Sequence, residues 1–115
     1  MRRYSVRRAT AVKLDFELIE SHLVHAYQDF GDDLESATAR AAARIEGALA
    51  YMRTFESHPH RGSEHPEILP GIHTVTSNNF VFYFETDERL SEVRILAVFF
   101  GGANHSQQIR ERLRP

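Results

Sequence analysis

The sequence has 115 residues but no cysteine, one lysine and no long apolar run. Without cysteine the chain has no disulfide, thiol nucleophile or thiolate metal ligand, which fits a reducing compartment. No apolar run approaches the roughly 20 residues of a membrane-spanning helix, and residues 1–8 lack the apolar stretch of a secretory signal. We therefore expect a single soluble domain over residues 1–115, in the cytoplasm and without membrane contact.

Nearly all basic residues are arginine, and basic and acidic residues occur in separate segments of the chain. Lys13 is the only base that is not arginine, and arginine suits bidentate pairing with carboxylate or phosphate. Residues 1–14 carry bases only, residues 15–35 carry acids only, and the net charge is −2. Two interpretations stay open: neighbouring segments pair with each other, or one basic face contacts a partner. The net acidity disfavours nucleic-acid binding through bulk charge.

Apolar periodicity predicts a first helix over residues 11–28, with Thr10 as its N-cap. Leu14 and Leu18 should widen its apolar face, which is formed by residues three and four apart, Val12, Phe16, Ile19 and Leu23. A β-branched and aromatic segment, residues 2–8, precedes it and is expected to be a strand.

A second helix is predicted to follow after a short turn, with Asp32 and Glu35 as its capping pair. Alanines make the helical preference strong, while Gly47 weakens it slightly. Its apolar seam alternates steps of four and three, at Leu34, Thr38, Ala41, Ile45, Ala48, Met52 and Phe55. The short connection implies an antiparallel αα-hairpin.

Prolines and glycines indicate an irregular loop over residues 57–71, after which three strands are expected, at 72–76, 80–85 and 93–100. A short tail helix follows, capped by Asn104 or Ser106, with Ile109 and Leu113 facing inward. The expected order is β-α-α-β-β-β-(α). We predict a two-layer α+β fold with the helical hairpin on a mostly antiparallel sheet. The tail helix or another protein chain should cover the second face of the last strand.

Metal and cofactor chemistry find little support in the sequence. His58, His60 and His65 lie in the loop, but their spacing matches no zinc pattern, and no P-loop, dinucleotide fingerprint or nucleophile elbow is present. We expect no metal and no cofactor. Metal-independent RNA cleavage needs an acid, a base and cations for the phosphate. The residues that suit those roles are Arg61, His73, Arg94 and His105.

Several segments in order resemble the RelE/ParE superfamily of toxins from type II toxin–antitoxin modules. These segments are Tyr4-Ser5-Val6, His60-Arg61-Gly62, Leu69-Pro70-Gly71-Ile72-His73, Phe80-Val81-Phe82-Tyr83 and the stretch from Ile95 to His105. The resemblance covers almost the whole chain. It implies the two-layer fold described above, with the Leu-Pro-Gly and strand-Gly-Gly segments closest to ParE-like members.

The resemblance also bears on activity. RelE-like members are ribosome-dependent endoribonucleases with a basic cluster on the later strands and a Tyr or His near the C-terminus. Here Gly71, His73 and Phe80 stand where those cations lie, Gly101 to Ala103 supply no base, and His105 is near the C-terminal position. ParE-like members instead inhibit DNA gyrase by binding, and the missing cations favour that branch.

The expected partner is therefore a cognate antitoxin, with DNA gyrase as the target. The antitoxin should lay a helix or strand over the helical hairpin and the sheet edge, and acidic side chains should meet the arginines of the first strand and the tail, Arg2, Arg3, Arg7, Arg8, Arg110, Arg112 and Arg114. Two alternative functions stay open: a ribonuclease acting on translated mRNA at the ribosome, or an inactive relative that only binds antitoxin. The oligomeric state stays open as well, between a homodimer and a toxin–antitoxin hetero-oligomer.

Overall fold

The computed structural model describes residues 2–102 and 105–115. Its elements, in chain order, are β1 (Ser5–Arg8), α1 (Ala11–Asp29), α2 (Leu34–Arg53), the 3-10 turn η1 (Thr54–Glu56), β2 (Ser63–Glu64), β3 (His73–Ser77), β4 (Phe80–Asp87), β5 (Glu92–Phe100) and α3 (Ser106–Arg112). The predicted succession and the α+β class are confirmed, with η1 and β2 as additions. None of the helices in the described ranges combines the length and apolar character that crossing a membrane requires.

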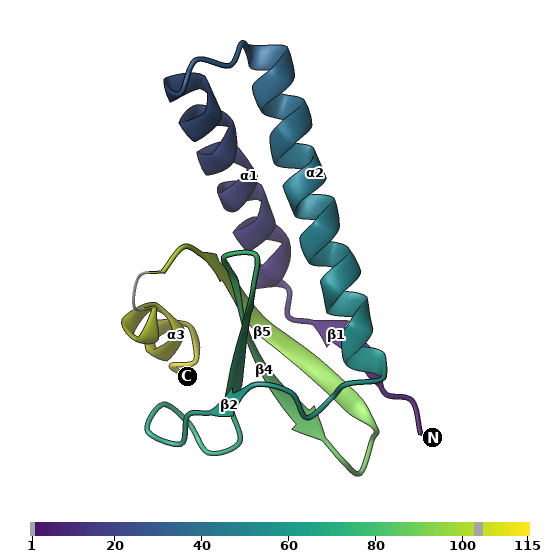
Figure 1. The fold of residues 1–115 in the computed structure, drawn as a ribbon. Coiled ribbons are helices and arrows are strands. Elements are labelled where there is room, and N and C mark those ends of the chain that lie inside the picture. Colours follow the sequence, from purple (N-terminus) through teal and green to yellow (C-terminus); the bar gives the residue numbers. More distant parts are fainter. Residues whose placement is uncertain (1, 103–104) are drawn as a thin grey trace.

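The five strands form one sheet in the order β1-β5-β4-β3-β2. β1 runs parallel to β5, with Val6 opposite Val93, and the other neighbouring strands are antiparallel. A register shift between Tyr83 and Phe84 interrupts the β4–β5 ladder. The α1–α2 hairpin lies against one face of the sheet and α3 against the other (Figure 1). The first strand thus forms one edge of the sheet.

One end of the helical hairpin packs on the sheet, and the other end projects beyond it (Figure 1). The predicted face of α1 is buried, as Val12, Phe16, Ile19 and Leu23 show. Leu14 and Leu18, expected to widen that face, are exposed because they lie on the outer side of the helix. Thr10 is not a side-chain cap either, since its backbone is already helical and its hydroxyl makes no capping bond.

The predicted seam of α2 is buried only in part, and near the free end the buried residue is Ala37, which is not on that seam. Ala41, Ala48 and Met52 are buried, whereas Leu34 and Thr38 are exposed near the free end. The N-cap is Asp33 rather than Asp32, because the Asp33 side chain accepts a hydrogen bond from the Ser36 amide at 2.8 Å.

The second face of the sheet is covered by α3. This is the first of the two covers that were expected, the tail helix or another protein chain. Ile109 is fully buried against Ile72, Tyr83 and Ala97 in a small apolar cluster, and Leu113 packs at its margin. The N-cap residue is His105, whose side chain makes no capping bond. The alternative cap, Asn104, lies outside the described residues. The chain therefore has a large core under the hairpin and a smaller one under α3.

The loop expected to be irregular contains the short strand β2, and this expectation was therefore wrong for residues 63–64. Ser63 pairs with Thr74 in an antiparallel ladder. Gly62 permits the pairing, because its φ is +86° and a Cβ there would lie 2.2 Å from the Thr74 carbonyl oxygen. Only glycine tolerates both the left-handed backbone and that approach.

Gly47, in the middle of α2, has no such requirement. A Cβ built at this position meets no atom within 4 Å, and the residue is exposed. Glycine costs a helix interior about 0.8–1 kcal/mol relative to alanine. We expect Gly47→Ala to raise the free energy of unfolding by about 1 kcal/mol in urea denaturation. An unchanged or lowered midpoint would contradict the helical interior assigned to this residue.

Candidate functional site

A hollow of about 260 Å³ lies on the face of the sheet that carries α3, beside that helix. Its polar walls come from the loop before β3, from β3 and β4, and from the segment after β5. The residues that line it are His65, Thr74, Thr76, Asn79, Val81, Tyr83, Gly101, Gly102 and His105. Two imidazoles and several hydroxyls thus meet here, although they are far apart in the sequence.

A chain of hydrogen bonds joins a carboxylate, an imidazole and a hydroxyl at this hollow. His65 Nδ1 lies 2.9 Å from Glu67 Oε1, and His65 Nε2 lies 2.9 Å from Thr74 Oγ1. An ionised carboxylate only accepts, so Nδ1–H donates to Glu67, while Nε2 is paired with the Thr74 hydroxyl, which can both donate and accept. The hydrogen bond from His65 lowers the pKa of Glu67. The two hydrogen bonds fix the orientation of the His65 ring.

His105 approaches the same hollow from the start of α3. Its ring stacks on Phe99, with centroids 4.7 Å apart and planes 13° from parallel. Its Nε2 lies 3.4 Å from the Gly101 carbonyl oxygen. Burial raises the pKa of Tyr83, whose hydroxyl group therefore stays protonated at neutral pH. The hollow offers imidazoles and hydroxyls that donate and accept hydrogen bonds.

The structure does not bring together the four residues predicted for RNA cleavage. His73 neighbours Thr74 on β3 but points to the opposite face, where it stacks 5.7 Å from Phe84, because successive strand residues alternate. Arg61 also lies on the helix side, with its guanidinium 4.9 Å from the Phe55 ring. Only His105 lines the hollow.

Arg94 lies on the outer part of β5 and is surrounded by acids. It donates hydrogen bonds to Glu92 at 2.8 Å, Glu85 at 2.9 Å and Asp87 at 3.1 Å. The bond to Glu92 contributes most to raising its pKa above the ordinary arginine value. With its donors occupied by three carboxylates, Arg94 is held as part of a surface ion-pair network. Among the described residues that line the hollow there is no lysine or arginine.

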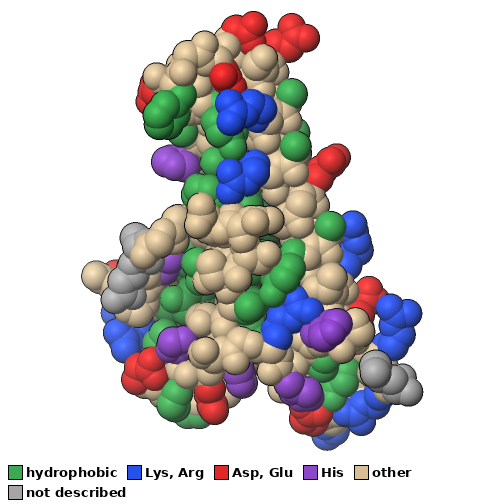
Figure 2. Space-filling view, in the orientation of Figure 1, with side chains coloured by type: hydrophobic (Ala, Val, Ile, Leu, Met, Phe, Trp, Pro, Cys, Tyr) green, Lys and Arg blue, Asp and Glu red, His purple; other side chains and the backbone are tan. Residues whose placement is uncertain are grey.

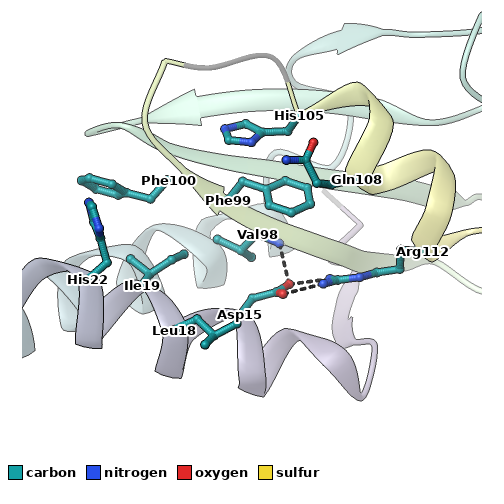
Figure 3. Close-up of a pocket in the computed structure, with 10 residues that line it drawn as sticks. All are labelled: Asp15, Leu18, Ile19, His22, Val98, Phe99, Phe100, His105, Gln108 and Arg112. Atoms are coloured by element: carbon teal, nitrogen blue, oxygen red, sulfur yellow. Dashed lines mark hydrogen bonds and ion pairs between the residues drawn. The ribbon is translucent and has the colours of Figure 1, made fainter.

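A second hollow, of about 350 Å³, opens between α1, the end of β5 and α3 (Figure 3). At one end Arg112 holds Asp15 through two hydrogen bonds of 2.6 Å, and Asp15 also accepts from the Val98 amide at 2.9 Å. Asp15 is buried, with 5% of its surface exposed. The bond to Asp15 raises the pKa of Arg112. Arg112 is thus engaged by Asp15 within the fold, and its predicted contact with an antitoxin stays a prediction.

The other arginines predicted to meet a partner lie around β1 and the tail. Arg2 reaches Glu88 at 3.2 Å and Arg7 reaches Glu92 at 3.2 Å, but both arginine side chains stay largely exposed. Arg110 donates to the Glu67 carbonyl oxygen at 3.3 Å. Arg3, Arg8 and Arg114, the rest of the arginines predicted to meet a partner, are exposed and form no salt bridge with the residues that the structure describes.

Grooves flank the first strand on both sides. One groove runs between α1 and α2 and includes Phe16, Ile45 and Leu49. The other lies on the outer sheet face and includes Leu90 and Leu96. Both are lined by Arg8 and Ala9 as well, so an apolar surface surrounds this edge of the sheet. Its border carries bases at the strand and acids beside them, Glu17 and Glu20 in one groove and Glu92 in the other.

The position of His65 between Glu67 and Thr74 was not predicted from the sequence, where this residue was considered only as a metal ligand. The signal that would have found it is the pairing of Ser63 with Thr74, which places His65 beside the Thr74 hydroxyl. In the parts of the chain that the structure describes, no three His, Cys, Asp or Glu side chains are grouped as a metal ion would require.

The sequence matches no protein-family model and no curated protein. Solved structures are similar in fold. A chain of the chromosomal ParDE toxin–antitoxin system from P. aeruginosa superposes with a TM-score of 0.67 at 17% identity, over 86% of this chain and 97% of that chain. A chain of the toxin–antitoxin complex RelBE2 from Mycobacterium tuberculosis gives a TM-score of 0.57 at 20% identity, over 87% and 93%. The chain thus has the RelE/ParE-like fold, as its sequence resemblance predicted.

Proposed function

We propose that this protein is the toxin of a type II toxin–antitoxin module and that it arrests growth by binding DNA gyrase. Its likeness in fold to chains of two toxin–antitoxin systems supports the first part. One observation favours the second part. The hollow on the sheet face beside α3 carries two imidazoles but, among its described lining residues, no lysine or arginine.

The lack of cations matters because RNA cleavage concentrates negative charge on a phosphate. Preorganised donors that stabilise such charge each contribute about 10²–10³-fold to the rate. Arg61 and Arg94, the predicted donors, are occupied elsewhere by Thr54 and by three carboxylates. A site without them binds a phosphodiester weakly, whereas inhibition by binding needs only a complementary surface.

A specific observation supports ribonuclease activity as a second candidate. His65, oriented by Glu67, and His105 line the same hollow and could serve as base and acid. If the protein cleaves RNA, His65→Ala and His105→Ala should each abolish growth inhibition. If it acts by binding gyrase, both variants should remain toxic, because the imidazoles then transfer no proton.

Purified protein in two parallel assays tests the choice of target. In a gyrase supercoiling assay we expect inhibition that rises with protein concentration. In a translation extract we expect full-length mRNA. Cleaved mRNA together with unaffected supercoiling would replace gyrase by the translating ribosome, and no effect in either assay would indicate a relative that only binds antitoxin.

The basic edge of the sheet is where we place the antitoxin. The reversal of both charges in Arg7→Glu/Arg8→Glu should weaken its binding at least tenfold, about 1.4 kcal/mol, because acidic antitoxin side chains would then face like charge. Titration calorimetry at two salt concentrations measures the loss. The matched control reverses Arg53 and Arg89, which are exposed and line neither groove. Equal affinities for both double variants would refute this docking site.

A further inference from the structure

The free end of the α1–α2 hairpin carries large apolar side chains that the fold leaves in solvent. Phe30 is 89% exposed and Leu34 is 61% exposed. They flank the turn between the helices, beyond the part of the hairpin that the sheet supports (Figure 1). We call residues 29–35 the tip. A phenylalanine this exposed adds nothing to folding through burial, so its position calls for another explanation.

The tip is held in one conformation by its own hydrogen bonds. The amides of Phe30, Gly31 and Asp32 donate to carbonyl oxygens of the last turn of α1, at 3.2, 2.9 and 3.1 Å. Gly31 supplies the left-handed backbone that the turn requires, with φ +109°. Asp33 caps α2 on the other side. Phe30 is therefore presented on a fixed backbone, and an anchor of this kind loses little entropy on binding.

The side of α2 below the tip adds further support. Asp32 pairs with Arg40 at 2.7 Å, and the Arg40 guanidinium lies 4.0 Å from the Tyr27 ring centroid. These contacts join the two helices at the end of the hairpin that projects beyond the sheet (Figure 1). The projecting end is thus fastened as a rigid arm.

The tip is also acidic. Residues 29–35 contain four acids and no base, Asp29, Asp32, Asp33 and Glu35. Figure 2 shows acidic side chains at the end of the hairpin farthest from the sheet. An apolar anchor within a negative surface fits an apolar pocket bordered by lysine or arginine.

We propose that the tip is the element that contacts the toxin's target, and that the target offers an apolar pocket with a basic border. This inference rests on the proposed role as a toxin that acts by binding. The charges of the tip favour such a protein over three other binding partners: a second copy of this chain, an anionic lipid surface and the antitoxin. Two copies of the tip would repel each other, anionic lipid would repel it as well, and the antitoxin's acidic residues suit the basic edge around β1 at the opposite end.

The test replaces both anchors, as Phe30→Ser/Leu34→Ser, in the full-length protein. The matched control is Leu14→Ser/Leu69→Ser, because both of those leucines are exposed away from the tip. Growth inhibition in cells is measured first, since it does not depend on which target is correct. We expect the tip variant to lose toxicity and to inhibit gyrase supercoiling at least tenfold more weakly, while the control variant matches the wild type.

Two further measurements separate the tip from the rest of the molecule. Urea unfolding and antitoxin affinity should be unchanged in the tip variant. Asp29→Lys/Glu35→Lys should also reduce toxicity, because it reverses the charge around the anchor. A fully toxic tip variant would overturn the proposal, as would loss of antitoxin binding or a dimer that the tip substitutions dissociate.

The same experiment tests separately whether gyrase is the target and whether the tip is the part of the toxin that contacts the target. If the wild type leaves supercoiling unaffected, gyrase is the wrong target, but the tip still stands or falls with growth inhibition in cells. If the wild type inhibits gyrase and the tip variant inhibits it equally, the proposed function holds and the tip is not the contact.

Discussion

Phe55→Ala is expected to lower the free energy of unfolding by about 4 kcal/mol, within the 3–5 kcal/mol range of buried Phe→Ala substitutions. Phe55 is fully buried beneath the junction of α2 and the sheet. Its ring centroid lies 4.7 Å from that of Phe84, 6.1 Å from Phe82 and 6.0 Å from Tyr51. Removing the ring leaves a cavity that these rigid aromatic neighbours cannot collapse to fill.

Urea denaturation of Phe55→Ala and Phe55→Leu gives the measurement and its control. Leucine keeps most of the apolar volume, so its loss should be well below that of alanine. Two variants with equal losses would mean that the aromatic contacts matter more than the volume. A loss under 1 kcal/mol for alanine would contradict the packing described for this core.

Asp15→Ala is expected to cost about 3 kcal/mol, which is at the lower end for breaking a buried ion pair because Arg112 is partly exposed. The substitution leaves the Arg112 guanidinium without its carboxylate. It also leaves the Val98 amide on β5 without its acceptor. Both losses loosen the attachment of α3, since Arg112 lies at the end of that helix.

A double-mutant cycle with Arg112→Met isolates the pair from the amide contact. Asp15→Asn serves as a control, because the amide oxygen still accepts from Val98 and should recover part of the stability. Asp32→Ala removes one partner of the exposed pair with Arg40 and should cost under 1 kcal/mol, as surface pairs do. If Asp15→Ala also cost under 1 kcal/mol, the apolar packing around Ile109 would be what holds α3 in place.

Local periodicity was enough to predict the helices, but the extent of their support was not visible in the sequence. Leu34 and Thr38 continue the apolar seam of α2, yet both are exposed, while Ala37 between them is fully buried. Which residues of α2 are buried depends on how α2 packs against α1 and on where the strands lie under the hairpin. That placement is set by pairing between distant segments, such as β1 with β5.

The site was harder to predict for the same reason. His73 was identified as a strand residue, but its face depends on register, and its neighbour Thr74 is the residue that faces the hollow. His65 reaches that hollow because Gly62 lets the loop pair with β3. Arg94 was a plausible phosphate contact until three carboxylates from two strands were found around it.

The parallel pairing of the first strand with the last long strand has a consequence for synthesis. Ser5 lies opposite Glu92 and Arg8 opposite Ile95, so the chain must be made at least as far as β5 before this edge of the sheet can form. Closing so long a loop carries a larger entropic cost than forming the local helical hairpin. The hairpin can thus be complete in a nascent chain while β1 still lacks its partner strand, and the sheet edge forms only after β5 has been made.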